Sequence, residues 1–181
     1  CTATASGKTA SCSITVEQAV TLQLTPSSRE LAKGHSFTIK KKVTPSTANA
    51  AADWKSSNNA IAKVTSAGKV TGKKYGSVNI TCTLKNYDVS ATCRVKVAKL
   101  RSTVKLNKSS IRINIGQTYR LKKTVWTNGS KNPKVTFKSK NKRIASVGKT
   151  SGKIKGKRVG STVITATTSD SVHAKAKCRV I

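Results

Sequence analysis

The chain has 181 residues, of which 36 are Lys or Arg and only 5 are Asp or Glu, so its net charge is +31. This length corresponds to one or two domains at roughly 100–200 residues per domain. Five scattered acids exclude a carboxylate-rich calcium site, and no apolar run approaches the ~18–20 residues that a membrane-spanning helix needs. No nucleophile–base pair, phosphate loop or metal cluster is visible, so we expect a strongly basic, non-enzymatic protein with no cofactor and no membrane span.

The first 16 residues read as a β-hairpin that belongs to an incomplete repeat. Cys1 and Cys12 are 11 residues apart, and the same spacing separates Cys82 from Cys93. We therefore expect residues 1–16 to be the terminal hairpin of a preceding domain, in a fragment of a longer tandem array. A lone hairpin has little stability of its own. One interpretation is that the hairpin marks a proteolytic or fragment boundary in a longer chain. The other is that it adds its strands to the incomplete sandwich of a neighbouring molecule, so that the chain self-assembles into a filament.

Two complete repeats follow, over residues 17–97 and 98–181. Short segments recur in the same order in both repeats, and internal self-similarity of this kind indicates a tandem architecture. The matching ranges are 34–41 with 116–123, 54–58 with 137–141, 68–72 with 152–156, 76–81 with 160–165, and 93–95 with 178–180.

Each repeat reads as a series of short β-strands. Phe37, Ile39 and Val43 alternate with polar residues, and a period of two predicts a half-buried strand. Such strands at ~8–12-residue spacing, separated by Gly, Ser and Asn, are typical of a β-sandwich or barrel. Lys41 and Lys123 fall on inward positions of this alternation, so each marks a bulge or reaches solvent along the sheet edge.

These ordered motifs resemble the bacterial immunoglobulin-like domain, group 2, of invasin- and intimin-like surface proteins. The resemblance covers nearly the whole chain and is carried by the Trp-Lys-Ser-Ser-Asn, Ile-Ala-Lys-Val, Gly-Lys-Val-Thr-Gly and Gly-Ser-Val-Asn-Ile motifs at residues 54–58, 61–64, 68–72 and 76–80. It implies an all-β fold of tandem immunoglobulin-like β-sandwich domains. It also implies a bacterial extracellular protein in which such domains form stalks or adhesins, with neighbouring repeats as partners and no catalytic residues.

The large aromatic residues have different expected roles. Trp54 and its counterpart Phe137 occupy a repeated strand position, so we expect both in the cores. Trp126 begins a segment, residues 126–133, that is longer and more polar than the matching residues 43–45 of the first repeat, and Trp126 itself has no counterpart there. It fills the core, packs between domains or stays exposed as a sugar-binding aromatic.

The cysteine spacing predicts two disulfides within hairpins, Cys1–Cys12 and Cys82–Cys93. In the last repeat Ala166 stands where the pattern expects a cysteine, which leaves Cys178 unpaired. Disulfides would place the protein in an oxidising, extracellular compartment. The alternative is that all five cysteines are reduced core thiols.

The basic residues concentrate in the last repeat. Residues 98–181 hold 22 basic residues and one acidic residue, a net charge of +21. Residues 17–97 hold 13 basic and 4 acidic residues, a net charge of +9. Because alternate residues of a strand share a face, dense basic stretches form outward rows that attract anions. The candidate polyanion-binding residues are Lys138, Lys140, Lys142, Arg143, Lys153, Lys155, Lys157 and Arg158.

Three interpretations of this charge remain open. It is a solvated surface without a ligand, it binds a cell-envelope or host polyanion or glycan, or it binds nucleic acid. Nucleic acid is the least favoured partner, because aromatic residues that stack on bases make up only 4% of the chain.

Overall fold

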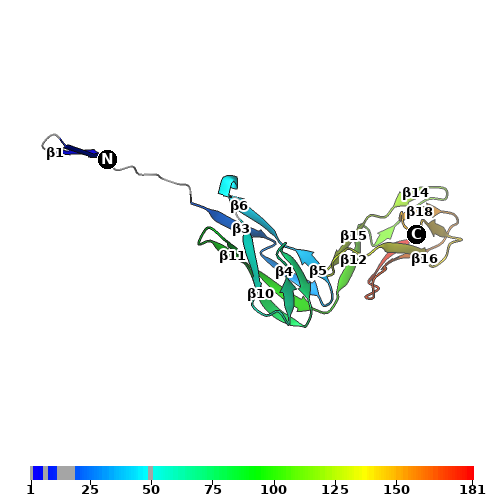
Figure 1. Cartoon of the computed structure of the whole chain (residues 1–181). Helices are drawn as coiled ribbons and strands as arrows, with labels where there is room; N and C mark the ends of the chain where they lie inside the picture. The colour runs from blue at the N-terminus through cyan, green and yellow to red at the C-terminus, as the bar shows by residue number, and fades with distance from the viewer. Residues whose placement is uncertain (1, 6–7, 12–18, 49–50) are drawn as a thin grey trace.

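The computed structural model describes residues 2–5, 8–11, 19–48 and 51–181 of the chain. Apart from a short hairpin at the start, the described strands build two β-sandwiches that follow one another along the chain (Figure 1). This all-β, tandem immunoglobulin-like fold confirms the predicted fold class. Within the described residues no helix is long and apolar enough to cross a membrane.

The hairpin consists of β1 (Thr2–Ala5) and β2 (Lys8–Ser11), which pair antiparallel with Thr2 opposite Ser11. The predicted disulfide between Cys1 and Cys12 lies outside the described residues.

The first sandwich has a four-stranded sheet in the order β4-β11-β10-β7, in which only the β4–β11 pair is parallel. These strands are β4 (Ser28–Ala32), β7 (Ala52–Ser56), β10 (Gly76–Leu84) and β11 (Ser90–Ala98). The facing layer holds the pair β3–β6 and the sheet β5-β9-β8. Its strands are β3 (Thr21–Thr25), β5 (Ser36–Thr38), β6 (Lys40–Thr44), β8 (Ala62–Val64) and β9 (Lys69–Gly72), and a 3-10 turn, η1 (Ser46–Ala48), follows β6.

The second sandwich repeats this arrangement. Its four-stranded sheet has the order β13-β20-β19-β16, formed by β13 (Ser110–Ile111), β16 (Val135–Ser139), β19 (Thr162–Thr168) and β20 (Lys175–Val180). The facing layer holds the pair β12–β15 and the sheet β14-β18-β17. These strands are β12 (Ser102–Leu106), β14 (Thr118–Arg120), β15 (Lys123–Thr127), β17 (Ala145–Val147) and β18 (Lys153–Gly156).

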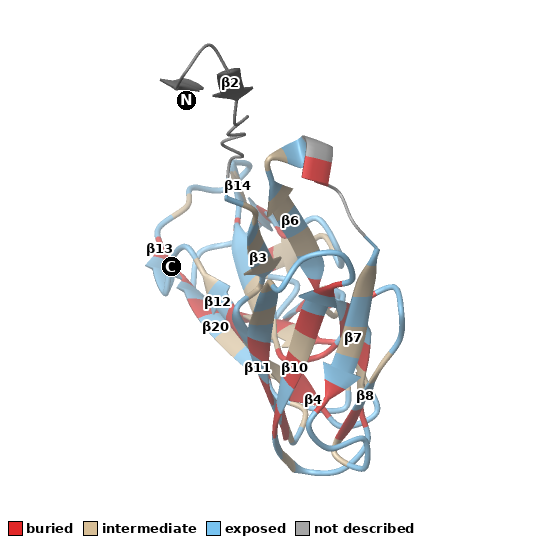
Figure 2. Cartoon of the chain, turned by 60° about the vertical axis from the view of Figure 1, so that its left-hand side comes forward, coloured by how far each residue is buried: buried red, intermediate tan, exposed pale blue. Residues whose placement is uncertain are grey.

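Burial alternates along the strands, as the period of two predicts. In β10 the side chains of Val78, Ile80, Cys82 and Leu84 are buried, while Asn79 and Thr83 between them are exposed. Figure 2 shows buried and less buried segments alternating along the strands. One face of each four-stranded sheet therefore packs on the core, and the other face meets solvent.

The strand that carries the Lys41 and Lys123 positions is interrupted in both repeats. Ile39 lies between β5 and β6, and its amide donates a hydrogen bond to the carbonyl of Gly68; Leu121 does the same to Gly152 in the second repeat, both at 3.0 Å. Lys41 is half-buried and Lys123 is exposed. Because of this interruption, the segment pairs with β9 through β5 and with β3 through β6. The alternation of inward and outward side chains therefore does not continue from the first strand into the second.

A glycine faces the large aromatic side chain of each core. A Cβ atom on Gly152, whose φ is +67°, would lie 2.8 Å from the carbonyl oxygen of Leu121 and 3.0 Å from the ring of Phe137. Gly68 has the same relation to Ile39 and Trp54 in the first repeat. Phe137 is 5% exposed and Trp54 packs half-buried against its core, which agrees with the core role expected for both.

The predicted Cys82–Cys93 disulfide is wrong: both residues are free, fully buried thiols in the structure. The β10–β11 register explains this result, because Cys82 lies opposite Ala91 and Cys93 lies opposite Ile80. The two cysteines share the inner face but are offset by two residues along the hairpin. Cys178 is also a free, buried thiol, as expected for the unpaired member of the pattern.

Candidate functional site

The predicted basic residues do not form one patch. Lys138 on β16, with Lys140 just beyond it, is exposed on the outer face of the four-stranded sheet, whereas Lys153 and Lys155 are exposed on β18 of the facing layer. Since the inner faces of the two layers meet in one core, these outer faces point to opposite sides of the sandwich. The predicted set is therefore divided between two surfaces.

The remaining predicted residues lie outside the strands. Lys142 and Arg143 are exposed in the turn between β16 and β17, so Lys142 does not continue the row that Lys138 and Lys140 begin. Lys157 and Arg158 are exposed in the segment that follows β18.

The last strand adds cations that the sequence analysis missed. On β20, Lys175, Lys177 and Arg179 are exposed, while Cys178 and Val180 are buried. They share an outer face with Lys138, because Lys138 pairs with Thr165 of β19 and Thr165 pairs with Lys177. Their spacing at every second residue, around a buried cysteine, was the signal that could have identified them.

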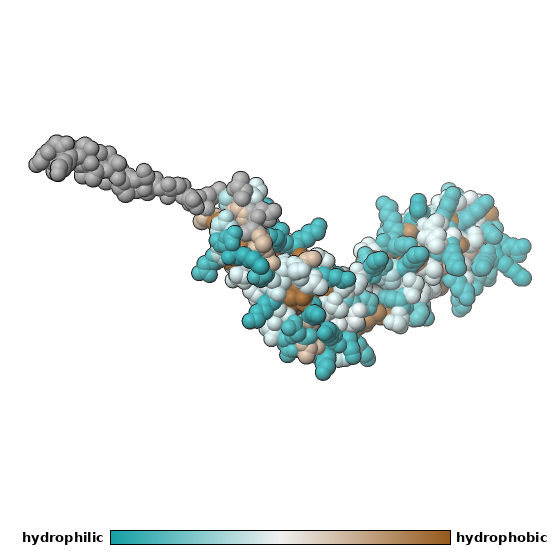
Figure 3. Space-filling model, in the orientation of Figure 1, coloured by the Kyte–Doolittle hydropathy of each residue, from teal (hydrophilic) through white to brown (hydrophobic). Residues whose placement is uncertain are grey.

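This surface, which we call the basic face, surrounds an open depression of about 620 Å³. The depression is lined by Lys138, Ser139, Lys140, Val163, Thr165, Thr167, Lys175 and Lys177, and a neighbouring one is bounded by Lys140 and Arg179. Figure 3 shows the hydrophilic character of the second sandwich, with hydrophilic side chains projecting around it.

A second candidate site is the joint between the sandwiches. Only residues 99–101 separate β11 from β12. The segment after β15, residues 128–134, reaches back to the first sandwich. There the backbone carbonyl of Asn128 accepts a hydrogen bond from the amide of Ala32 at 2.8 Å.

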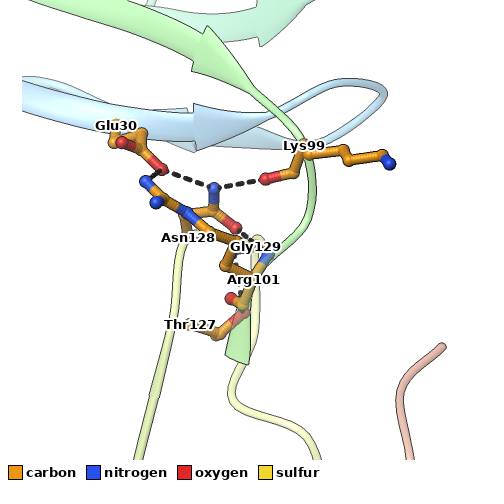
Figure 4. A network of polar contacts seen from close by, with 6 residues as sticks. All are labelled: Glu30, Lys99, Arg101, Thr127, Asn128 and Gly129. Carbon is orange, nitrogen blue, oxygen red and sulfur yellow. Dashed lines mark hydrogen bonds and ion pairs between the residues drawn. The ribbon is translucent and has the colours of Figure 1, made fainter. Parts of the chain in front are cut away.

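The Asn128 side chain is the centre of this joint and is only 1% exposed (Figure 4). Its Nδ2 donates hydrogen bonds to Oε1 of Glu30 at 2.9 Å and to the carbonyl of Lys99 at 2.8 Å. Its Oδ1 accepts a hydrogen bond from the amide of Arg101 at 2.8 Å. Asn128 thus connects the first sandwich, the linker and the second sandwich through one buried amide group.

Charge reinforces this contact. The Arg101 guanidinium donates a hydrogen bond to Oε1 of Glu30 and forms an ion pair with it. The Arg101 hydrogen bond, assisted by that of Asn128, outweighs the effect of burial and holds the pKa of Glu30 below its ordinary value. Glu30 therefore stays ionised in the joint at neutral pH.

Two further contacts close the joint. The amide of Ser130 donates to Nδ1 of His35 at 3.0 Å, and the amide of Ser36 donates to Oγ of Ser130 at 2.8 Å. Between these groups, a Cβ atom on Gly129 would lie 3.2 Å from Leu100 and 3.3 Å from His35, so glycine allows the close approach. The sequence analysis singled out the segment 126–133 but did not identify its partner in the first sandwich.

Trp126, at the start of that segment, is 51% exposed on β15. Of the three roles considered for Trp126, the core role is therefore excluded. Among the described residues, no cluster of His, Cys, Asp or Glu side chains could hold a metal ion.

The fold and the joint define a class of protein: a string of immunoglobulin-like β-sandwiches linked end to end. A family model described as the bacterial Ig-like domain (group 2) matches residues 13–95 and 102–180. The chain belongs to this family.

Comparisons with individual proteins agree with this assignment. An uncharacterised protein of Clostridium acetobutylicum is 31% identical over 164 residues, which cover 90% of this chain but only 17% of that protein's length. Domains 4 and 5 of the surface-layer protein SbsC superimpose with a TM-score of 0.51 at 18% identity, over 90% of this chain and 96% of theirs. A C-terminal fragment of intimin, solved with the intimin-binding domain of its translocated receptor, has a TM-score of 0.37 at 19% identity, over 90% of this chain and 63% of that fragment. At 18% identity, the match with the SbsC domains shows the fold alone.

Proposed function

We propose that this chain is a non-enzymatic spacer segment of a bacterial extracellular surface protein, one that holds successive modules in a fixed relative orientation. The joint carries this proposal. A flexible tether needs no contacts between its modules, whereas here a buried side-chain amide group of the second sandwich bonds to the first sandwich and to the linker.

The physical argument rests on the cost of opening the joint. Separation of the sandwiches would leave the polar groups of Asn128, Glu30 and Arg101 without their present partners, and water would have to replace them. Buried hydrogen bonds, especially those to charged groups, resist such exchange. Short linkers without Gly or Pro, such as residues 97–102, limit the motion further.

The family and the protein class support the surface location. The modules of a spacer are flanked by other modules of the same protein. The chain spans only 17% of the length of its Clostridium relative, which therefore has room for such modules. The alternative function within the same class of surface protein is adhesion, in which the modules themselves contact another cell.

Protease treatment of intact bacteria that express the parent protein tests the location. We expect trypsin to release peptides of this lysine-rich chain from the cell surface, while a cytoplasmic marker protein stays uncleaved. Recovery of these peptides only after cell lysis would contradict the proposal.

A further inference from the structure

The basic face of the second sandwich is not required by the fold, because the first sandwich builds the same sheet without it. The register of the two sheets is equivalent: Lys138–Thr165–Lys177 in one row corresponds to Lys55–Thr81–Thr92 in the other. At the five cationic positions of the basic face, the first sandwich has two cations and three small hydroxyl residues. The pairs are Lys138 with Lys55, Lys140 with Ser57, Lys175 with Ser90, Lys177 with Thr92, and Arg179 with Arg94.

The outer face of the second sheet also lacks an acidic residue that the first sheet carries. In the first sandwich Asp53 lies on the outer face of β7, opposite Thr83, and pairs with Lys85 at 3.4 Å. Its counterpart in the second sandwich is Thr136, opposite Thr167. The one acid of the second repeat, Asp170, instead accepts hydrogen bonds from the hydroxyls of Ser102 and Thr168.

The charges of the basic face are therefore unneutralised. Within the described part of the chain, none of its five cationic side chains forms an ion pair or hydrogen bond. Strands ~4.8 Å apart, with side chains ~6.6–6.8 Å apart along each strand, place these like charges near one another. Like charges at this spacing repel, and an anion bound between them removes that repulsion.

We propose that the basic face is a binding site for a linear acidic polysaccharide. Charge complementarity requires a polyanion, and the open depression is lined by residues of three neighbouring strands, β16, β19 and β20, so it offers several contact points to a polymer. Its floor offers the hydroxyls of Thr165 and Thr167, which can hydrogen-bond to sugar hydroxyl groups. No aromatic side chain lines the depression, so the stacking platform that single-stranded nucleic acids use is missing.

The first sandwich supplies the test variant. The triple substitution Lys140→Ser, Lys175→Ser and Lys177→Thr installs residues that the equivalent sheet already carries, so the fold is expected to tolerate them. The matched control is Arg120→Thr, Lys153→Thr and Lys155→Thr, which removes three charges from the opposite layer. Both variants have the same net charge.

The experiment measures binding of the full chain to polygalacturonate by titration calorimetry at 150 mM NaCl. Neutral dextran and single-stranded DNA are the comparison polymers, and circular dichroism verifies the fold. We expect the basic-face variant to lose about tenfold or more in affinity, from three surface charge contacts together, and to show a shallower dependence on salt. The control variant should lose less than twofold.

Three outcomes would overturn the proposal. Equal losses in both variants would mean that only net charge matters. Unchanged binding in the basic-face variant would place the polymer elsewhere, and tighter binding of DNA than of polygalacturonate would assign the face to nucleic acid. None of these outcomes affects the spacer proposal, because both variants leave the joint intact.

Discussion

The side-chain amide of Asn128 donates a hydrogen bond of 2.9 Å to the Glu30 carboxylate, although 98 residues separate them in the sequence. Glu30 belongs to β4 of the first sandwich, and Asn128 follows β15 of the second. This contact lies between two separate hydrophobic cores, so its strength governs the relative orientation of the modules.

Replacement of Asn128 by alanine is expected to weaken the joint. The substitution leaves the amide of Arg101 and the carbonyl of Lys99 without their partners, at a cost of about 1–3 kcal/mol if they stay buried. We expect a lower free energy of unfolding in urea, or an opened joint that admits water, which small-angle X-ray scattering would detect as a broadened distance distribution.

Asn132→Ala is the matched control for this experiment. Asn132 lies in the same segment, but it is exposed. Its replacement should change neither the urea midpoint nor the scattering profile. Identical behaviour of the two variants would show that Asn128 has no special role.

Acid should loosen the joint through Glu30. Its pKa in the folded chain is lowered from 4.5, mainly by Arg101 and further by Asn128, with Lys96 as another charged neighbour. A lowered pKa means that the stabilisation is complete above the ordinary value and is lost as the pH falls through the lower, folded value.

The measurement is an NMR titration of the Asn128 side-chain amide signals between pH 7 and pH 2. We expect them to shift with a midpoint below 4.5 in the native chain and to lack that transition in Glu30→Gln. His35 also faces the joint and is retained in this variant, so the difference isolates the carboxylate. A Glu30 midpoint at or above 4.5 would contradict the ion pair.

Gly152→Ala should destabilise the second sandwich more than Gly116→Ala. Both glycines have positive φ, +67° and +84°, so alanine is strained at both, by roughly 1–2 kcal/mol. Only at Gly152 does the added Cβ also meet backbone and the Phe137 ring, within 3.0 Å; at Gly116 nothing lies within 4 Å. Urea unfolding of the two variants gives the difference directly, and equal losses would show that the contact over Phe137 is absent.

Much of the fold follows from the sequence. The alternation around Val78 and Ile80 and the recurring glycines identify the strands and the two sandwiches, because burial on one face imposes a period of two. Pairing details are harder to predict. Equal spacing of Cys82–Cys93 and Cys1–Cys12 suggested partners, but a register offset of two residues decides which side chains meet, and turn geometry sets that offset.

The sites were predicted less completely. Dense runs such as residues 138–143 are visible as charge, yet alternation and turns divide them between faces. Lys175 and Lys177 were missed because they are spaced apart in sequence and join Lys138 only through sheet pairing. The Glu30–Asn128 contact depends on how two domains dock, which local patterns do not encode.

The buried thiols should react slowly in the native protein. Burial raises the pKa of Cys82, Cys93 and Cys178, which lowers the fraction present as reactive thiolate. Labelling with iodoacetamide at pH 8, followed by peptide mass spectrometry without reduction, should modify these three residues only after denaturation. Recovery of a Cys82–Cys93 cross-linked peptide would show that the register allows a disulfide after all.

The most direct test of the fixed orientation is a set of backbone amide residual dipolar couplings for the full chain. A rigid joint predicts that the couplings of residues 21–98 and 102–180 fit one common alignment tensor, and that Asn128→Ala separates them into two. If the native chain already requires two tensors of different magnitude, the sandwiches move independently and the spacer is a flexible tether.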